Sequence, residues 1–285
     1  MTLHVRGARS TAAAEKVVRG DLLRMAASTV VRFCSDTTAI LDMEVRKLWH
    51  DPLEVFTRAV QPVLWLVIFG KVMAATHAIP TGTLSYEDFL APGILAQSTM
   101  FVAIFFGIAL IWERDLGVLN KFLVSPASRA ALVTGKAASA GVRALVQGLI
   151  VYAVAAALGV DLHLDVLALA GVVAALLIGA ALFATFSLVI ACLVRTRERF
   201  MGLGQLVTMP LFFASNAIYP IAIMPAGLGA LARVNPLSYQ ADALRALMLA
   251  HGVSRFGLTT DFGVLAGVFV VLVAVAARLY PRAVL

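Results

Sequence analysis

Long apolar runs occupy most of this chain, and they constrain its fold more than any other feature. A helix needs about 20 apolar residues to cross the hydrocarbon core of a bilayer. Six runs approach or exceed that length, at residues 55–75, 90–112, 137–158, 166–194, 200–219 and 261–280. The sequence therefore predicts an all-α polytopic membrane protein with six transmembrane helices.

The composition agrees with a membrane location. Hydrophobic residues make up 61% of the chain and charged residues only 14%, whereas a soluble domain carries about 25% charged residues. The two cysteines, Cys34 and Cys192, lie far apart and have no CxxC spacing. This spacing argues against a disulfide framework and against a structural zinc site.

The basic residues predict the orientation of the chain. Most of the 23 Lys and Arg residues precede the first run, follow the last one, or lie in the connections 113–136 and 195–199. Cytoplasmic loops carry such an excess, so we expect both termini and these two connections to be cytoplasmic. The net charge of +7 then reflects topology and does not require nucleic acid as a partner.

The chain before the first run divides into two parts. Residues 1–36 show little periodicity, and we expect a mobile cytoplasmic tail there, followed by a transmembrane domain at 37–285. In "AILDMEVRKLWHDP" four apolar residues share one side of a helical wheel: Leu41, Val45, Leu48 and Trp49. This pattern is typical of an amphipathic helix that lies flat on the membrane. A solvated tail helix is the alternative.

Groups that could carry chemistry are scarce in the sequence. The runs contain no HExxH motif and no pair of intramembrane carboxylates, and "TGKA" at 134–137 lacks the Ser/Thr and the preceding glycine of a phosphate-binding P-loop. The chain is therefore expected to have no ATP site of its own. Arg143 is interpreted as either interfacial or substrate-contacting. Four glutamines are interpreted as contacts between helices: Gln61, Gln97, Gln147 and Gln205.

The charged stretch "WERDLGVLNKFLVSPASR" lies between the second and third runs. Leu116, Leu119 and Leu123 form a stripe at helical spacing, while Gly117 and Lys121 face away. A short amphipathic helix between two spans can act as a lever that moves both, or it can be a simple connector. The pattern alone leaves both interpretations open.

The segment after the fifth run is broken repeatedly by Pro and Gly, yet it remains apolar. Irregular backbone at membrane depth is tolerated only when it is buried in protein or lines a cavity. We therefore expect a re-entrant segment on the outer side, with an ordinary external loop as the alternative. A helix is predicted from Pro236 to about residue 249. In the last run, the spacing of Gly263 and Gly267 is interpreted as helix packing.

These segments also carry a resemblance to a known family. The stretches "ERDLGVLNKFLVSPASRAALVTGK" and "YPIAIMPAGLGALARVNPLSYQADALR", with the entry "EVRKLWHDPLEVFTRAVQPVLW", resemble the permease subunits of type-2 ABC exporters. The resemblance covers residues 37 to 280, and the daunorubicin-resistance-type permeases look closest in length and layout. Val118 departs from the pattern, because a small hydroxyl residue commonly follows the glycine in that family.

The resemblance implies a function and a set of partners. The protein would be the membrane-spanning subunit of an exporter in the cytoplasmic (inner) membrane of a bacterium, and it would move drugs, lipids or glycan-linked molecules. It would form a dimer with a second copy or a paralogue. It would bind no cofactor directly, because a separate ATP-binding subunit would hold ATP with Mg and hydrolyse it.

The resemblance also implies roles for particular residues. The contact with the ATP-binding subunit would map onto Glu113, Arg114, Leu116, Gly117, Leu119 and Leu123. The outer re-entrant region would include Tyr219, Pro220, Pro225, Asn235, Pro236, Tyr239 and Arg245.

A membrane-embedded lipid- or glycan-modifying transferase is the alternative function, with Asn216, Tyr239 and Asp242 as its site. A passive channel or scaffold is a third.

Overall fold

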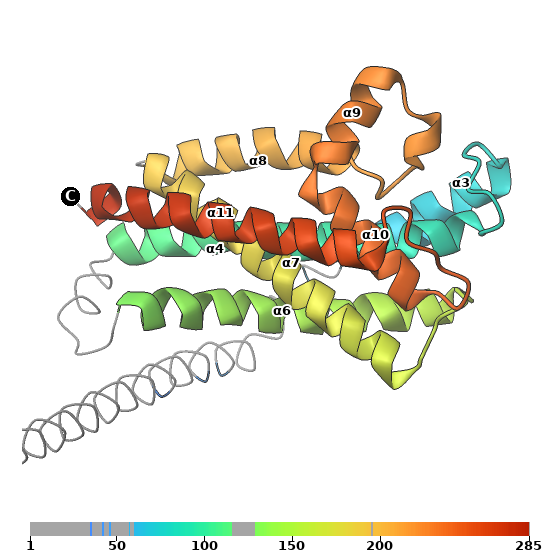
Figure 1. Ribbon diagram of the computed structural model, residues 1–285, viewed down its shortest axis with the longest axis horizontal. Coiled ribbons are helices and arrows are strands. Elements are labelled where there is room, and N and C mark those ends of the chain that lie inside the picture. The colour runs from blue at the N-terminus through green and yellow to red at the C-terminus, as the bar shows by residue number, and fades with distance from the viewer. Residues whose placement is uncertain are drawn as a thin grey trace, which may run out of the picture.

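The computed structural model describes residues 60–115, 129–194 and 196–284, together with Ser35, Asp42, Arg46 and Thr57. Within these residues the regular secondary structure is helical, apart from one isolated bridge between Leu162 and Leu249. The long helices lie side by side along the long axis of the molecule (Figure 1). The predicted all-α class is confirmed.

The elements follow the order expected from the apolar runs. After a helical start at residues 60–64, they are η1 (Trp65–Gly70), α3 (Lys71–Thr76), α4 (Tyr86–Asp115), α6 (Arg129–Ala157), α7 (Val166–Leu193), α8 (Arg197–Phe213), η2 (Ile221–Ile223), α9 (Ala226–Val234), α10 (Pro236–Met248) and α11 (Leu258–Val284).

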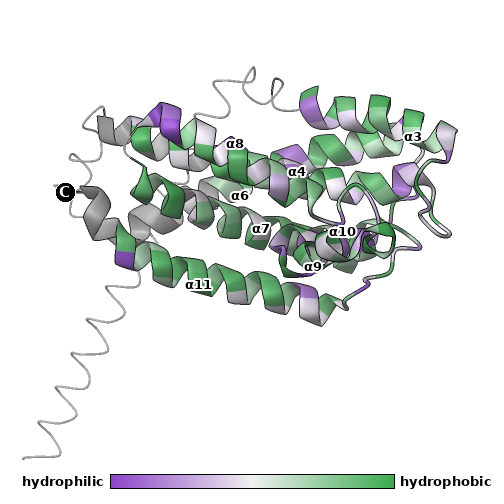
Figure 2. Ribbon diagram, turned by 90° about the horizontal axis from the view of Figure 1, so that it is seen from above, coloured by the Kyte–Doolittle hydropathy of each residue, from purple (hydrophilic) through white to green (hydrophobic). Residues whose placement is uncertain are grey.

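Four of these helices have segments that are long and apolar enough to cross a membrane: Tyr86–Phe105, Ala140–Ala157, Val166–Leu193 and Leu258–Leu279. The apolar helix Val60–Thr76 is shorter, and α8 has 17 residues. Hydrophobic residues follow α11 along its length, with hydrophilic ones at its ends (Figure 2). The described residues therefore contain a multi-pass membrane domain, and the count of six spans stays a prediction.

Helix α7 forms the centre of the bundle. It packs against α4, α6, α10 and α11, and small side chains along it allow close contact. Asp165 caps its first turn by accepting hydrogen bonds from the backbone N–H groups of Leu167 and Ala168 at 3.0 and 3.4 Å. Its other half is joined to α4, because the Ser187 hydroxyl donates to the Ile104 carbonyl and accepts from the Gly107 N–H.

The first span contains a π-helical turn, η1, before α3. Its aromatic side chains face the bundle, since the Trp65 ring lies edge-on to Phe69 and to Phe212 at the end of α8. The Phe69 ring in turn contacts Tyr86 at the start of α4. The aromatic side chains of the π turn thus join the first span to α4 and α8.

The predicted end of the fifth span was wrong. Helix α8 ends at Phe213, although the fifth span was predicted to reach residue 219. The Asn235 amide and the Ser215 hydroxyl donate to carbonyls of its last turn, so the chain can turn there without leaving these groups unpaired. Helices α4 and α11 contain the spans predicted at 90–112 and 261–280 and extend beyond them, and α6 begins at Arg129, before the span predicted at 137–158.

Gly263 and Gly267 were expected to let another helix approach closely, and within the described chain they do not. A Cβ atom at either position would meet nothing within 4 Å, so no other part of the described chain approaches them. The close approach lies at Gly93 of α4, where a Cβ would come within 1.9 Å of the Ala217 carbonyl oxygen. Only glycine allows the turn after α8 to pack against α4 at this distance.

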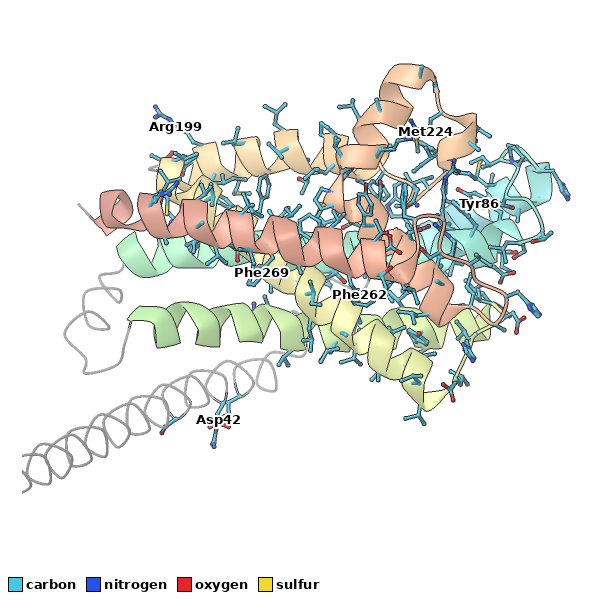
Figure 3. All side chains as sticks on the ribbon, in the orientation of Figure 1. Asp42, Tyr86, Arg199, Met224, Phe262 and Phe269 are labelled. Carbon is cyan, nitrogen blue, oxygen red and sulfur yellow. The ribbon has the colours of Figure 1, made fainter. Side chains whose placement is uncertain are left out.

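The bundle has two distinct ends. At the terminal end lie the C-terminus, the last turn of α4, the first turn of α6 and the connection from α7 to α8 (Figure 1). At the loop end, residues 77–85, 158–165 and 249–257 meet, and the Asp161 N–H donates to Asp88 at 3.2 Å. Arg199 lies at the terminal end, and Tyr86 and Met224 lie towards the loop end (Figure 3).

Candidate functional site

The chain after α8 folds back into the bundle through Asn235. Its side-chain amide donates to the carbonyls of Leu211 and Ala214 at 2.6 and 2.8 Å. Its side-chain oxygen accepts from the Leu237 N–H at 3.0 Å and caps α10, with Pro236 at the first helical position. One buried asparagine therefore ends α8 and starts α10.

Helix α10 lies inside the protein, and its position along α7 gives its depth. The Gln240 amide lies 3.5 Å from the Ala175 carbonyl, and a Cβ on Gly179 would come within 2.2 Å of the same amide. Gly179 lies midway along α7, about 20 Å from the loop end at 1.5 Å per residue. At the other end of α10, the Met248 carbonyl accepts from the His163 N–H at 2.8 Å. Helix α10 thus runs from the middle of the bundle to its loop end.

Arg245 fixes α10 to its surroundings. It is 5% exposed, and its guanidinium donates to the carbonyls of Phe89 in α4 and Asn216 at 3.3 and 2.9 Å. The guanidinium also lies over the Phe89 ring, 3.9 Å from the ring centre. Its charge is paired with Asp242, one turn earlier, at 3.6 Å. Arg245, which lies on the helix predicted after Pro236, is therefore a buried structural cation.

Asp242 links the Arg245 guanidinium to residues 254–256, which precede α11. Its carboxylate accepts from the Ser254 hydroxyl at 3.1 Å and from the N–H groups of Arg255 and Phe256 at 2.7 and 3.0 Å. The Ser254 hydroxyl also lies 2.8 Å from the carboxylate of Asp261 in α11. Asp242 and Asp261 are 2% and 0% exposed. We call Asn216, Asp242, Arg245, Ser254 and Asp261 the carboxylate cluster.

This pair of buried carboxylates was not predicted, because Asp242 lies outside the apolar runs that were searched for intramembrane carboxylates. Sequence reasoning missed it because Asp242 and Asp261 lie in different helices, and neither interrupts the centre of a long apolar run. The signal available in the sequence was weak: Asp242 and Arg245 are three residues apart, which places them on one side of a helix. A buried ion pair of this kind must be surrounded by hydrogen bonds, and the folding back of residues 249–257 provides them.

The other predicted residues of the re-entrant region lie around α9. The Tyr219 hydroxyl donates to the Phe213 carbonyl, Pro220 precedes η2, and Pro225 precedes α9. The Tyr239 hydroxyl donates to the Arg233 carbonyl, and its ring lies 4.7 Å from that of Phe256. Of the three residues expected for a transferase site, Asn216 and Asp242 meet at 3.4 Å. The Tyr239 hydroxyl is bonded to a different part of the chain.

The predicted coupling and interfacial residues are mostly outside the described part of the chain. Leu116, Gly117, Leu119 and Leu123 lie there, as do Leu41, Val45, Leu48 and Trp49. Glu113 and Arg114 belong to the last turn of α4, and their side chains are not described. Next to them, the Arg197 guanidinium of α8 lies 4.0 Å from the centre of the Trp112 ring. The end of α4 is therefore in contact with the start of α8.

Two cavities lie along α4 at the middle of the bundle. A cavity of about 50 Å³ is lined by Gln61, Pro62, Gln97, Ser98, Phe101, Val102, Phe105 and Gln147, and we call it the glutamine pocket. A cavity of about 180 Å³ lies between α4 and α8 and shares Phe101 and Phe105 with it, and we call it the apolar cavity. Gln61, Gln97 and Gln147 lie in three separate apolar runs of the sequence, and only the structure shows that they line one pocket.

Metal chemistry has no candidate centre in the ranges described. No three His, Cys, Asp or Glu side chains gather there in a way that could hold a metal ion. Arg143, whose position was left open, lies on α6 and is partly buried. Besides the two cavities along α4, a cavity of about 370 Å³ lies at the loop end, lined by Thr83, Leu84, Asp88, Asp161, Leu249 and His251.

Comparison with known proteins gives a consistent set of relatives. The chain is 34% identical over 195 residues to Nodulation protein J of Rhizobium leguminosarum bv. trifolii, covering 68% of this chain and 73% of the relative. It is 29% identical over 241 residues to the Daunorubicin resistance ABC transporter permease protein DrrB1 of Streptomyces coeruleorubidus, covering 82% and 80%. It is 28% identical over 205 residues to the Putative transport permease ycf38 of Cyanophora paradoxa, covering 70% of each.

A match to a protein family covers most of the chain. Residues 35–249 match the family described as ABC-2 type transporter, and this range contains the first span, the α4 cavities and the whole of α10. The relatives named above are transport permeases by two of their three names. With its multi-pass helical fold, the chain therefore belongs to the ABC-2 type transporter family.

Proposed function

We propose that this protein is the membrane-spanning permease subunit of an ATP-driven exporter in the cytoplasmic membrane of a bacterium. Its substrate would be a hydrophobic or amphipathic molecule such as a drug, a lipid or a glycolipid. The observation that carries the proposal is the family match over residues 35–249. The name of one relative, a daunorubicin resistance permease, supports export of an amphipathic drug-like molecule, and efflux of several drugs would follow from the same cavities.

In this proposal the terminal end of the bundle is cytoplasmic and the loop end faces outside. The excess of Lys and Arg before the first span and in the connections at the terminal end supports this orientation. Both termini would be cytoplasmic, with residues 1–36 as a tail and 37–285 as the transmembrane domain. The interfacial helix with Leu41, Val45, Leu48 and Trp49 would lie on the same membrane surface.

The ATP-binding subunit would dock at the terminal end, on Glu113, Arg114, Leu116, Gly117, Leu119 and Leu123. That subunit would bind ATP with Mg, and the permease would bind no cofactor. The contact between Trp112 and Arg197 and the Ser187 bonds to α4 support this position. A push on the end of α4 would be transmitted to α7 and α8, which border the cavities.

The movement would reach the opposite end of α4, at the loop end of the bundle. The Phe89 carbonyl of α4 accepts a hydrogen bond from Arg245, and the turn at Ala217 packs on Gly93. A shift of α4 would therefore displace α10 and the carboxylate cluster, which would act as the outer gate. A second copy of the chain or a paralogue would complete the transport path as a dimer.

The test is ATP-dependent transport with the ATP-binding subunit encoded nearest to this gene. Inverted membrane vesicles that contain both proteins should accumulate daunorubicin when ATP is added. Vesicles with an ATPase-inactive partner should not, and neither should vesicles that lack the permease. The proposal would be contradicted if the two proteins neither copurify nor transport any of a panel of amphipathic drugs and lipids. Lipid- or glycan-transferase activity of the purified chain without a partner would favour the transferase.

A matched pair of variants tests the docking segment. Leu119→Asp places a charge in the leucine stripe and should reduce substrate-stimulated ATPase activity and transport at least tenfold, while the protein still inserts into the membrane. Val118→Asp makes the same kind of change on the opposite face of the predicted helix, and coupling should be retained. Equal effects of the two changes, or full coupling in Leu119→Asp, would refute the assigned docking face.

A further inference from the structure

The glutamine pocket has a polar wall at the middle of an otherwise apolar bundle. Gln61 comes from the first span, Gln97 from α4 and Gln147 from α6. Gln97 and Gln147 are each 3% exposed. At 1.5 Å per residue, Gln97 and Gln147 lie about 15 Å along their helices from the loop end. The pocket is therefore placed near the centre of the membrane, where a polar group without a partner is costly.

One donor in this wall has no partner. The side-chain nitrogen of Gln147 is buried and makes no hydrogen bond, and the Gln147 side chain lines a cavity of about 50 Å³. The neighbouring Ser98 hydroxyl donates to the Ile94 carbonyl of its own helix at 2.7 Å. Buried polar groups in proteins almost always have a partner, so an unpaired amide beside an empty space indicates an acceptor that occupies the space.

The chemistry of the wall limits what the acceptor can be. The lining consists of amides, a hydroxyl, a proline and apolar side chains and includes no charged residue. The volume is enough for a few water-sized groups, and it is too small for a sugar ring. An uncharged oxygen, as in a carbonyl or hydroxyl group, fits both limits.

The apolar cavity supplies space for the rest of such a molecule. It is lined by Ile104, Ile108, Phe200, Met201 and Thr208 among others, and it shares the rings of Phe101 and Phe105 with the glutamine pocket. Phe105 is 46% exposed, so the two cavities adjoin where the bundle surface is open. An amphipathic molecule could place its apolar body against α8 and its polar end against Gln147.

We propose that the glutamine pocket is a binding subsite for a carbonyl or hydroxyl oxygen of an amphipathic substrate, with the Gln147 amide as the donor. The inference rests on the proposed function, because it names the chemical class of the molecule that the permease carries. It assigns to Gln147 a specificity role, since substrates without an acceptor oxygen would gain nothing from this contact.

The test uses two fluorescent amphipathic probes with protein in phosphatidylcholine nanodiscs, with empty nanodiscs as the background. Daunorubicin carries carbonyl and hydroxyl oxygens, and ethidium carries no oxygen. Gln147→Met keeps the length of the side chain and removes the donor. It should raise the Kd for daunorubicin about tenfold, as expected for the loss of one buried hydrogen bond. The Kd for ethidium should stay within twofold, which also shows that the variant is folded.

A control variant and separate readouts make the result decisive. Thr185→Val removes a hydroxyl on α7 that bonds to the Ala181 carbonyl of its own helix and lines neither cavity, and both Kd values should stay within twofold. Equal weakening of both probes by Gln147→Met, no weakening at all, or no daunorubicin binding by the wild-type protein would overturn the subsite and leave a pocket occupied by water only. ATP-driven transport is measured separately, so selective binding without transport would contradict the exporter and not the subsite.

Discussion

The carboxylate cluster and the glutamine pocket are both polar regions inside an apolar bundle, and they differ in how their polar groups are paired. In the cluster, Asp242 accepts from Ser254, from two backbone N–H groups and from Asn216, and it faces the Arg245 cation. In the pocket, the Gln147 nitrogen has no partner, and the Gln147 side chain lines a cavity. In the cluster the Asn216 side-chain oxygen, the Arg245 Nε and one Asp261 oxygen also lack a partner, but none of these residues lines the glutamine pocket or the apolar cavity. The two regions therefore differ in that Asp242 is fully engaged within the protein, whereas Gln147 lines a cavity.

The difference indicates two kinds of role. A polar network whose members bond to one another holds chain segments together, and its loss leaves buried charges unpaired. A polar group beside a cavity contributes little to the fold until a ligand arrives. We therefore expect substitutions in the cluster to change stability first and substitutions in the pocket to change binding first.

The largest effect should come from Asp242→Ala. The change removes the acceptor of four hydrogen bonds and leaves Arg245 as an uncompensated buried cation, which costs about 3–5 kcal/mol. The thermal unfolding midpoint of the purified protein in nanodiscs should fall steeply. The control is Asp161→Ala at the same end, where the pair with His251 is largely exposed and is worth at most about 1 kcal/mol. Similar midpoints for the two variants would show that the cluster does not hold the loop end together.

A steric change at Gly93 should have the next largest effect. Gly93→Ala forces the Ala217 carbonyl away from α4, and overpacking of this kind costs about 1–3 kcal/mol. Gly263→Ala is the matched change at a position with open space around it, and it should be neutral or stabilising because alanine favours the helix. Thermal unfolding of both variants checks the pair, and equal destabilisation would contradict the close approach at Gly93.

Asn235→Ala should have a smaller effect. It removes the cap of α10 and two donors to the end of α8, which together are worth about 1–2 kcal/mol. Protease accessibility of residues 214–235 should rise as the joint between the helices loosens. Thr196→Ala removes a longer, exposed capping bond at the start of α8 and should leave this accessibility unchanged. A protected 214–235 segment in Asn235→Ala would show that α9 and α10 are held by other contacts.

The smallest effect on stability is expected for Gln147→Met, which completes the comparison. The Gln147 nitrogen gives up no hydrogen bond in the protein, and the new side chain has a similar volume, so the free energy of unfolding should change by less than about 1.5 kcal/mol. A destabilisation as large as that of Asp242→Ala would show that the amide serves the fold. The unfolding midpoint in nanodiscs distinguishes these results.

Local patterns in the sequence determined the class of protein and much of its helical layout. Long apolar runs need helices because lipid offers no partner to the backbone, and this predicted α4, α6, α7 and α11 without any knowledge of contacts. The Asn235-Pro236 pair predicted the start of α10 within a residue, because capping depends on neighbours in the chain. The motifs of segments 113–136 and 219–245 indicated the family, which the match over residues 35–249 showed.

Tertiary structure alone decided which residues meet. The end of α8 at Phe213 depends on Asn235, the residue that caps α10, and the contact of Asp242 and Asp261 with the same Ser254 hydroxyl depends on how residues 249–257 fold back. The convergence of Gln61, Gln97 and Gln147 and the choice of Gly93 over Gly263 have the same cause. Helix formation depends on local spacing, whereas these contacts depend on the relative rotation and depth of whole helices, which no local pattern encodes.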